Sequence, residues 1–170
     1  MVGLDRTERA SWCFVECLVD AVEVFGAEVQ VCAWQRPANS HLASWLAALD
    51  EFAGANIWEI LEPDQQPQLK SLPPSRERSL LADDLALQGT ALCDLLGCPA
   101  YGLRMVRTRE AMCPGWHVDQ VSLRVVCTYL GPGTQWLADQ STDRGKLRDR
   151  RTQSADFVCA AAGDVVLLKG

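Results

Sequence analysis

The chain has 170 residues, with 16 lysines and arginines against 22 aspartates and glutamates, so its formal net charge is −6. This length suits one domain, and 48% hydrophobic residues are enough to bury a core. The acidic balance argues against a nucleic-acid partner, because duplex binding needs a surplus of lysine and arginine on one face. No stretch approaches the roughly 20 apolar residues of a membrane span.

The N-terminal residues and the cysteine and histidine contents restrict the compartment and the kinds of site that we expect. Residues 1–9 lack the apolar core of a secretory signal, which predicts a cytoplasmic protein. In that compartment the eight cysteines are not expected to form a disulfide framework, and most lie in apolar runs. The two histidines, His41 and His117, exclude a site with three imidazoles from one chain. His41 lies at the start of an expected helix, where a surface or capping role is the simpler interpretation.

The first 98 residues predict a mainly helical region, because apolar residues recur there every three or four positions. Prolines and glycines separate the segments, and serines precede two of them as helix caps. The expected elements are a helix from Arg6 to Phe25, a strand from Ala27 to Trp34, a helix from Ser40 toward Gly54, a loop between Pro63 and Pro74, and a helix from Ser75 or Ser79 to Gly97.

Residues 99–170 predict a β-rich region, since short runs of β-forming residues alternate with Gly, Pro and Asp turns. Strands are expected within Tyr101–Arg109, Ser122–Leu130, Phe157–Ala162 and Val165–Leu168. The fold class is therefore predicted as α+β, with residues 1–98 and 99–170 forming one integrated domain.

The tripeptide His117-Val118-Asp119 carries the most specific chemistry. If it is extended, alternate side chains point the same way, so the imidazole and the carboxylate can grip one cation. One nitrogen and one oxygen donor are two thirds of the facial triad that binds non-haem Fe(II). The alternative is structural, with His117 bonded to its own loop and Asp119 capping a turn.

The residues around this tripeptide resemble a known kind of enzyme. His117-x-Asp119, a following strand from Leu123-Arg124 to Tyr129-Leu130, and the turn Gly131-Pro132-Gly133 resemble the core of 2-oxoglutarate and Fe(II)-dependent oxygenases. More closely, residues 113–139 and 163–170 resemble an uncharacterised bacterial family, domain of unknown function 1826, as does Trp34-Gln35-Arg36-Pro37. The resemblance implies a double-stranded β-helix (cupin-like, jelly-roll) C-terminal half, onto which the helical half packs.

The resemblance also implies ligands and cofactors. His117 and Asp119 match the first two metal ligands, for Fe(II) with 2-oxoglutarate as cosubstrate. Arg124 and Tyr129 lie where oxygenases place groups that contact the cosubstrate, although strand alternation also allows Arg124 to face water and Tyr129 to lie in the core. No histidine follows His117, so the distal histidine of the pattern is absent, which is expected of a truncated version of a longer protein or of an incomplete site.

Two other functions stay open at this stage. Cys113 lies four residues before His117, and as a soft additional ligand it would favour Zn²⁺, which suggests a non-catalytic zinc-handling or metal-sensing protein. An interaction domain without a metal is the third possibility. The acidic balance fits a small-molecule or a protein substrate equally.

Overall fold

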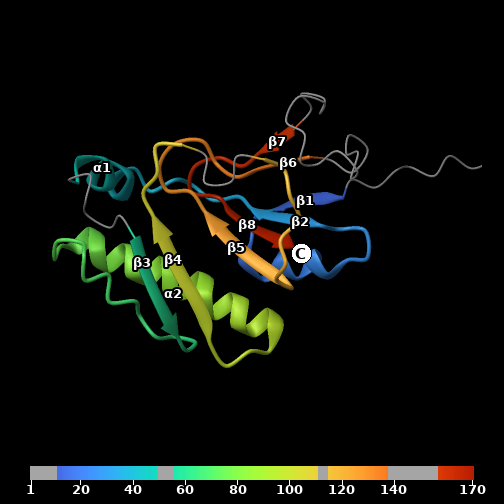
Figure 1. The fold of residues 1–170 in the computed structure, drawn as a ribbon, viewed down its shortest axis with the longest axis horizontal. Coiled ribbons are helices and arrows are strands. Elements are labelled where there is room, and N and C mark those ends of the chain that lie inside the picture. Colours follow the sequence, from blue (N-terminus) through green and yellow to red (C-terminus); the bar gives the residue numbers. More distant parts are fainter. Residues whose placement is uncertain (1–10, 50–55, 111–114, 138–156) are drawn as a thin grey trace, which may run out of the picture.

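The computed structural model describes residues 11–49, 56–110, 115–137 and 157–170. Helices and strands alternate irregularly along these segments (Figure 1). The elements are β1 (Trp12–Val15), η1 (a 3₁₀ helix, Leu18–Phe25), β2 (Val31–Trp34), α1 (Ser40–Ala48), β3 (Asn56–Leu61), α2 (Arg76–Leu96), β4 (Tyr101–Val106), β5 (Leu123–Cys127), β6 (Gln135–Leu137), β7 (Phe157–Cys159) and β8 (Val165–Lys169). The mixed α/β class predicted from the sequence is confirmed.

A four-stranded sheet in the order β1-β2-β8-β5 joins the two halves of the chain. β1 and β2 are parallel, whereas β8 is antiparallel to both of its neighbours, β2 and β5. Two further antiparallel pairs, β3 with β4 and β6 with β7, form separate two-stranded sheets. Because β2 lies directly beside β8, residues from the first fifth of the chain are hydrogen-bonded to residues near its end.

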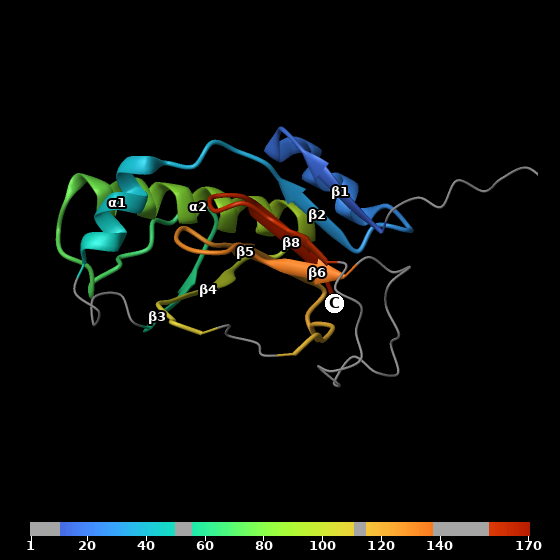
Figure 2. The ribbon, with the colours of Figure 1, turned by 90° about the horizontal axis from the view of Figure 1, so that it is seen from above.

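Both faces of the four-stranded sheet are covered, and the alternation along β8 divides its side chains between them. Val165 and Leu167 contact Ala21 and Val24 of η1 together with residues of α2, and both helices lie along this face (Figure 2). Val166 faces the other way, in a cluster with Trp136 of β6. The β6–β7 pair therefore packs on the sheet face opposite η1 and α2.

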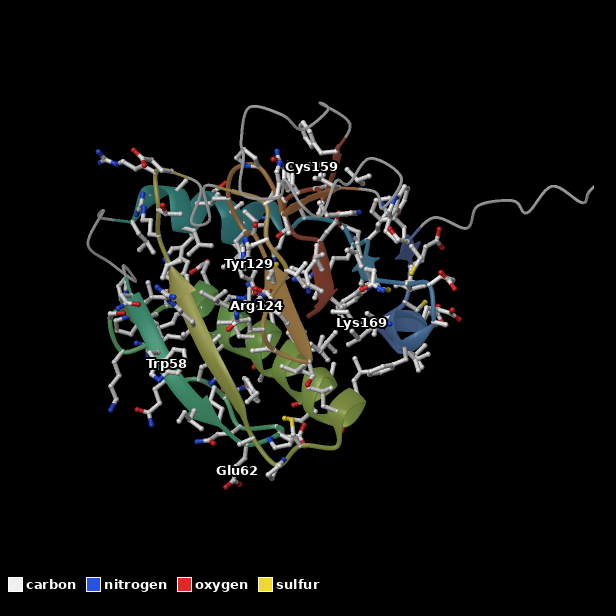
Figure 3. The ribbon with its side chains drawn as sticks, turned by 45° about the vertical axis from the view of Figure 1, so that its right-hand side comes forward. Trp58, Glu62, Arg124, Tyr129, Cys159 and Lys169 are labelled. Carbon is white, nitrogen blue, oxygen red and sulfur yellow. The ribbon has the colours of Figure 1, made fainter. Side chains whose placement is uncertain are left out.

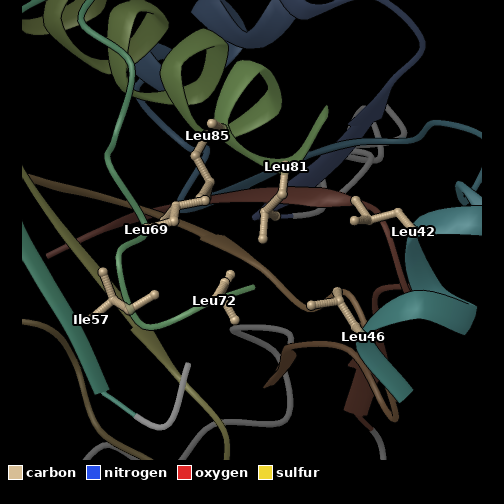
Figure 4. Close-up of a cluster of buried hydrophobic side chains, with 8 residues drawn as sticks. Leu42, Leu46, Ile57, Leu69, Leu72, Leu81 and Leu85 are labelled. Atoms are coloured by element: carbon tan, nitrogen blue, oxygen red, sulfur yellow. The ribbon is translucent and has the colours of Figure 1, made fainter. Parts of the chain in front are cut away.

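The helix α2 organises a second core. Ser75 caps its start by accepting a hydrogen bond from the Arg78 amide, and Gly97 ends it in the left-handed conformation at φ 62°. Its leucines pack against α1, β3 and the loop before α2 (Figure 4). The fully or nearly fully buried members of this cluster are Leu42, Leu46, Ile57, Leu69, Leu72, Leu81, Ala82 and Leu85.

Three local predictions differ from the structure. The helix expected from Arg6 to Phe25 is wrong at residues 12–15, which form β1, whereas Leu18–Phe25 form a 3₁₀ helix; residues 6–10 lie outside the described residues. Trp12–Val15 pair in register with Val31–Trp34, and this tertiary pairing outweighs the helical spacing of the apolar side chains. Asn39, rather than Ser40, caps α1. The strands β3 and β6 are not among the elements that the sequence predicts.

Candidate functional site

His117 lies in the irregular segment before β5, and its ring orientation fixes its tautomer. Its Nδ1 atom is 3.1 Å from the carbonyl oxygen of Gly115. Because a carbonyl can only accept, Nδ1 must carry the hydrogen, and the neutral ring then keeps its lone pair on Nε2. Metal-binding histidines commonly use this arrangement, in which one ring nitrogen donates to a carbonyl and the other binds the metal.

The Nε2 atom faces the carboxylate of Asp119. It lies 3.5 Å from Oδ1, longer than the 2.7–3.2 Å of an ordinary N–H···O hydrogen bond. A neutral imidazole nitrogen and a carboxylate oxygen at this separation are suited to sharing a cation, because two metal bonds of about 2.1 Å at an angle of about 90–110° place their donors about 3.0–3.4 Å apart. The two predicted ligands are therefore brought together with nearly the spacing that a metal requires.

Arg124, the second residue of β5, holds the other oxygen of the same carboxylate. Its Nε atom is 2.7 Å from Oδ2 of Asp119. The Asp119 side chain is only 13% exposed, whereas His117 is 51% and Arg124 48% exposed. The guanidinium thus fixes the carboxylate from the outer side and leaves Oδ1 directed toward His117.

This pair would supply two protein ligands to a metal. Within the segments that the structure describes, no group of three or more His, Cys, Asp and Glu side chains could hold a metal ion. Cys113, the possible third ligand, lies outside the described residues. The donor set fits a metal that keeps several coordination positions for other ligands, as Fe(II) does in the facial-triad sites.

Tyr129 belongs to a different cluster. It lies two residues beyond the end of β5, whereas Arg124 lies near the start of that strand (Figure 3). At about 3.3 Å per residue, the strand separates Arg124 from Cys127 by about 10 Å. The Tyr129 hydroxyl donates a hydrogen bond to Asp84 and accepts one from Gln88 at 3.0 Å. The structure therefore joins His117, Asp119 and Arg124 but places the Tyr129 hydroxyl against α2.

The cluster around Tyr129 is centred on a two-bond ion pair between Arg36 and Asp84. Nη1 and Nη2 of Arg36 each bind one oxygen of Asp84, the second at 2.8 Å. Gln88, one helical turn further along α2, donates to the same carboxylate at 2.9 Å. The Arg36 and Asp84 side chains are 16% and 19% exposed, so this is a largely desolvated pair with most of its hydrogen bonds satisfied.

The turn before β8 completes this network. Arg36 donates from Nε to the carbonyl of Gly163 and from its backbone amide to Asp164, at 3.3 Å. Gly163 has a φ of 94°, and a Cβ there would lie 3.2 Å from Cα of Ala38. The network consequently ties together the end of β2, the middle of α2, the end of β5 and the start of β8.

The charges of this network have opposite effects on its titratable groups. Burial by itself would raise the pKa of Asp84, but hydrogen bonds from Arg36 and Tyr129 and the charge of Arg36 outweigh it and hold that pKa below its ordinary value. Burial raises the pKa of Tyr129, and the charges of Cys127 and Asp84 add to the effect. Asp84 is therefore ionised and Tyr129 is neutral across the neutral pH range.

A cavity of about 350 Å³ adjoins this network. Arg36, Asp84 and Tyr129 form its polar side, and Leu42 and Leu87 contribute to its apolar side. Sequence reasoning did not select Arg36, Asp84 or Gln88 as site residues. One usable signal was that Asp84 and Gln88 interrupt the apolar stripe of α2 beside Leu81 and Leu85, where a polar residue requires a buried partner.

Comparisons with known proteins identify the family alone. None of the helices within the described residues is long and apolar enough to cross a membrane. No curated protein and no solved structure matches the chain. A family model described as "Protein of unknown function (DUF1826)" matches residues 17–170, so the chain belongs to that family.

Proposed function

We propose that this protein is of the Fe(II)- and 2-oxoglutarate-dependent oxygenase type, with His117 and Asp119 as metal ligands. One observation carries the proposal. The hydrogen bond from Nδ1 of His117 to Gly115 leaves the Nε2 lone pair facing Oδ1 of Asp119 at 3.5 Å. A cation shared by a neutral imidazole nitrogen and this carboxylate oxygen would stabilise the arrangement.

The strand arrangement around the pair supports the double-stranded β-helix that such enzymes use. Along the chain the four strands run β5, β6, β7, β8; the outer two pair with each other and the inner two pair with each other. The inner pair packs on the sheet that contains the outer pair. Nested antiparallel pairs in two facing sheets are the pattern of one turn of a jelly roll, and the His-x-Asp tripeptide lies directly before its first strand.

Arg124 positions the carboxylate in this proposal. Its Nε hydrogen bond to Oδ2 fixes the Asp119 rotamer, so Oδ1 stays available for the metal. The Arg124 side chain remains 48% exposed beside this bond, so its guanidinium would be able to donate to a carboxylate of 2-oxoglutarate. Tyr129 has a structural role here, because its hydroxyl is already bound to Asp84 and Gln88.

The cofactors would supply oxidative decarboxylation of 2-oxoglutarate coupled to oxidation of a substrate by O₂. The chain's own contribution is to hold the imidazole in one tautomer and to provide one negative charge from Asp119 that offsets the metal. His117 is half-exposed, so a small-molecule or protein substrate can approach from solvent.

The test is an anaerobic titration of the metal-free full chain with Fe(II) followed by 2-oxoglutarate. We expect a visible charge-transfer absorption band in the wild type that is lost in His117→Ala and Asp119→Ala. His41→Ala is the matched control, because His41 is the other histidine of the chain and lies exposed on α1. A band that is absent, or that is equal in all four proteins, contradicts the proposal.

Zinc binding is the outcome that favours the non-catalytic alternative. The 3.5 Å donor separation lies just beyond the wide end of the expected range, the end that corresponds to a tetrahedral angle, as in zinc sites. Protein purified without added metal would then contain stoichiometric zinc by elemental analysis. If Cys113→Ala and His117→Ala both remove that zinc, and Fe(II) with 2-oxoglutarate gives no band, the oxygenase proposal is wrong.

A further inference from the structure

Two thiols meet where α2 ends. Gly97 adopts the left-handed conformation, and the amides of Gly97 and Cys98 both donate to the carbonyl oxygen of Cys93, the latter at 3.1 Å. This six-to-one hydrogen bond belongs to the Schellman type of helix ending, which brings the side chains at its two ends into contact. That contact is usually hydrophobic, but here it joins two cysteines.

The two sulfur atoms are close to bonding distance. The Cys98 thiol donates to the sulfur of Cys93 with an Sγ–Sγ separation of 3.6 Å, and a disulfide needs about 2.05 Å. Rotation of the two side chains closes a gap of about 1.5 Å, while the backbone hydrogen bonds already hold the two residues together. Oxidation therefore requires little movement of α2.

The surroundings give the two cysteines different roles. Cys93 is buried in a cluster with Leu61 and Tyr101, whereas Cys98 is partly exposed. Burial raises the pKa of Cys93 to about 11, and its hydrogen bond with Cys98 adds to the effect. A reagent from solvent thus meets Cys98 first, and Cys93 stays a protonated thiol until a neighbouring sulfur becomes electrophilic.

Tyr101 belongs to the same buried cluster as Cys93. This side chain is 7% exposed, and its hydroxyl has no hydrogen-bond partner among the described residues. Burial raises its pKa, and the charges of Cys93 and Glu59 add to the effect. Its ring is held against α2 at Gly89, where a Cβ would lie 2.0 Å from the ring. Because Cys93 and Tyr101 share this buried cluster, the dithiol lies in a tightly packed setting.

We propose that Cys93 and Cys98 are a reversible redox site that forms an intramolecular disulfide by exchange with a low-molecular-weight disulfide such as oxidised glutathione. The Cys98 thiolate attacks one sulfur of the small disulfide and releases one thiolate, which gives a mixed disulfide. Cys93 then attacks the Cys98 sulfur, loses its proton and releases the second thiol. Each cycle converts two protein thiols and one small disulfide into one protein disulfide and two small thiols. The new bond ties the last turn of α2 to the segment that leads into β4.

The sequence makes the test direct. Trypsin cleaves after Arg78 and Arg104, and the fragment between them contains Cys93 and Cys98 as its only cysteines. The chelator-treated full chain is equilibrated in buffers of reduced and oxidised glutathione, quenched with acid, alkylated and digested. We expect oxidising buffers to give a fragment that is lighter by two hydrogen atoms and takes up no alkyl group, and dithiothreitol to restore two alkylated cysteines.

Two variants complete the test. A variant with Cys17→Ser and Cys159→Ser removes two exposed thiols and should show the same internal link at the same buffer ratio. Cys98→Ser should leave Cys93 alkylatable after denaturation in every buffer. If the wild-type fragment carries two alkyl groups in all buffers, or links to other cysteines in preference, the proposal is overturned. The wild-type result alone decides this, so the proposal does not depend on the folding of a variant.

Discussion

The two polar clusters of this protein are built in opposite ways. The Arg36–Asp84 cluster joins residues up to 128 positions apart, and its two charged side chains are 16% and 19% exposed. The His117–Asp119–Arg124 cluster lies within eight residues of sequence, and two of its three side chains are about half-exposed. One cluster exists because the chain has folded, and the other is presented to solvent by one short segment.

This difference separates the roles of the clusters. A desolvated ion pair has already exchanged water for protein partners, so breaking it leaves a buried charge without compensation. In the second cluster Asp119 is itself only 13% exposed, but both of its side-chain partners are about half-exposed, so water screens these pairs and they contribute less to stability. We therefore expect substitutions in the first cluster to act on unfolding and substitutions in the second to act on metal binding.

The largest expected effect is that of Asp84→Ala. This change removes both hydrogen bonds of the Arg36 pair and the acceptor for Tyr129, and we expect it to lower the free energy of unfolding by about 3 kcal/mol. Urea denaturation measures this. Asp83→Ala is the matched control, since Asp83 is exposed on the same helix and should change stability by no more than about 0.5 kcal/mol. Equal effects of the two changes would contradict a structural role for the pair.

A smaller loss is expected from Tyr129→Phe. The ring stays in place, but Asp84 and Gln88 lose their hydrogen bonds to the hydroxyl. Because one of these partners is charged, the expected cost is about 1.5–2 kcal/mol, again measured by urea denaturation. In the Asp84→Ala background the same change should cost less, and a cost that is fully additive would show that the two groups act independently.

The pH dependence of stability tests the same pair without breaking it. The pKa of Asp84 is lowered from 3.8 in the folded state, so its ionised form adds stability that is complete above the unfolded pKa. That stability is lost as pH falls through about 3.8 toward the folded pKa. The stability gap between wild type and Asp84→Asn should stay constant from about pH 7 to pH 5 and narrow below about pH 4. A gap that widens under acid conditions has the wrong sign for this account.

The smallest effects on stability are expected in the exposed cluster. His117→Ala and Arg124→Gln should each change the free energy of unfolding by about 0.5 kcal/mol or less. Chemical denaturation in the presence of a chelator measures the protein without a metal contribution. A loss near 2 kcal/mol in either variant would show that this cluster also stabilises the fold, which would contradict the distinction between the two clusters.

The sequence predicted the elements whose signals are local. The helix α2 has Ser75 at its start and Gly97 at its end, and both residues mark the helix ends in the structure. β5 and β8 contain dense β-forming residues and were predicted near their observed bounds. The strand β1 was not, because Trp12–Val15 are extended only through pairing with β2, an interaction that helical periodicity in the sequence does not reveal.

The same distinction explains which parts of the sites were predictable. His117 and Asp119 could be paired from the sequence because a two-residue spacing acts through local geometry. Arg36 meets Asp84 and Gly163 only after β2, α2 and β8 have assembled. The place of Tyr129 in the chain associates it with His117 and Asp119, but its hydroxyl is bound to Asp84 and Gln88 of the buried cluster.

Metal affinity at the exposed cluster tests the central claim most directly. Isothermal titration of the metal-free chain with Mn(II), a redox-stable substitute for Fe(II), should give one site per chain. We expect His117→Ala and Asp119→Ala to lose at least about tenfold in affinity and Arg124→Gln to lose about tenfold, because it orients Asp119. His41→Ala should bind as the wild type does. Equal affinity in the wild type, His117→Ala and Asp119→Ala would contradict the account.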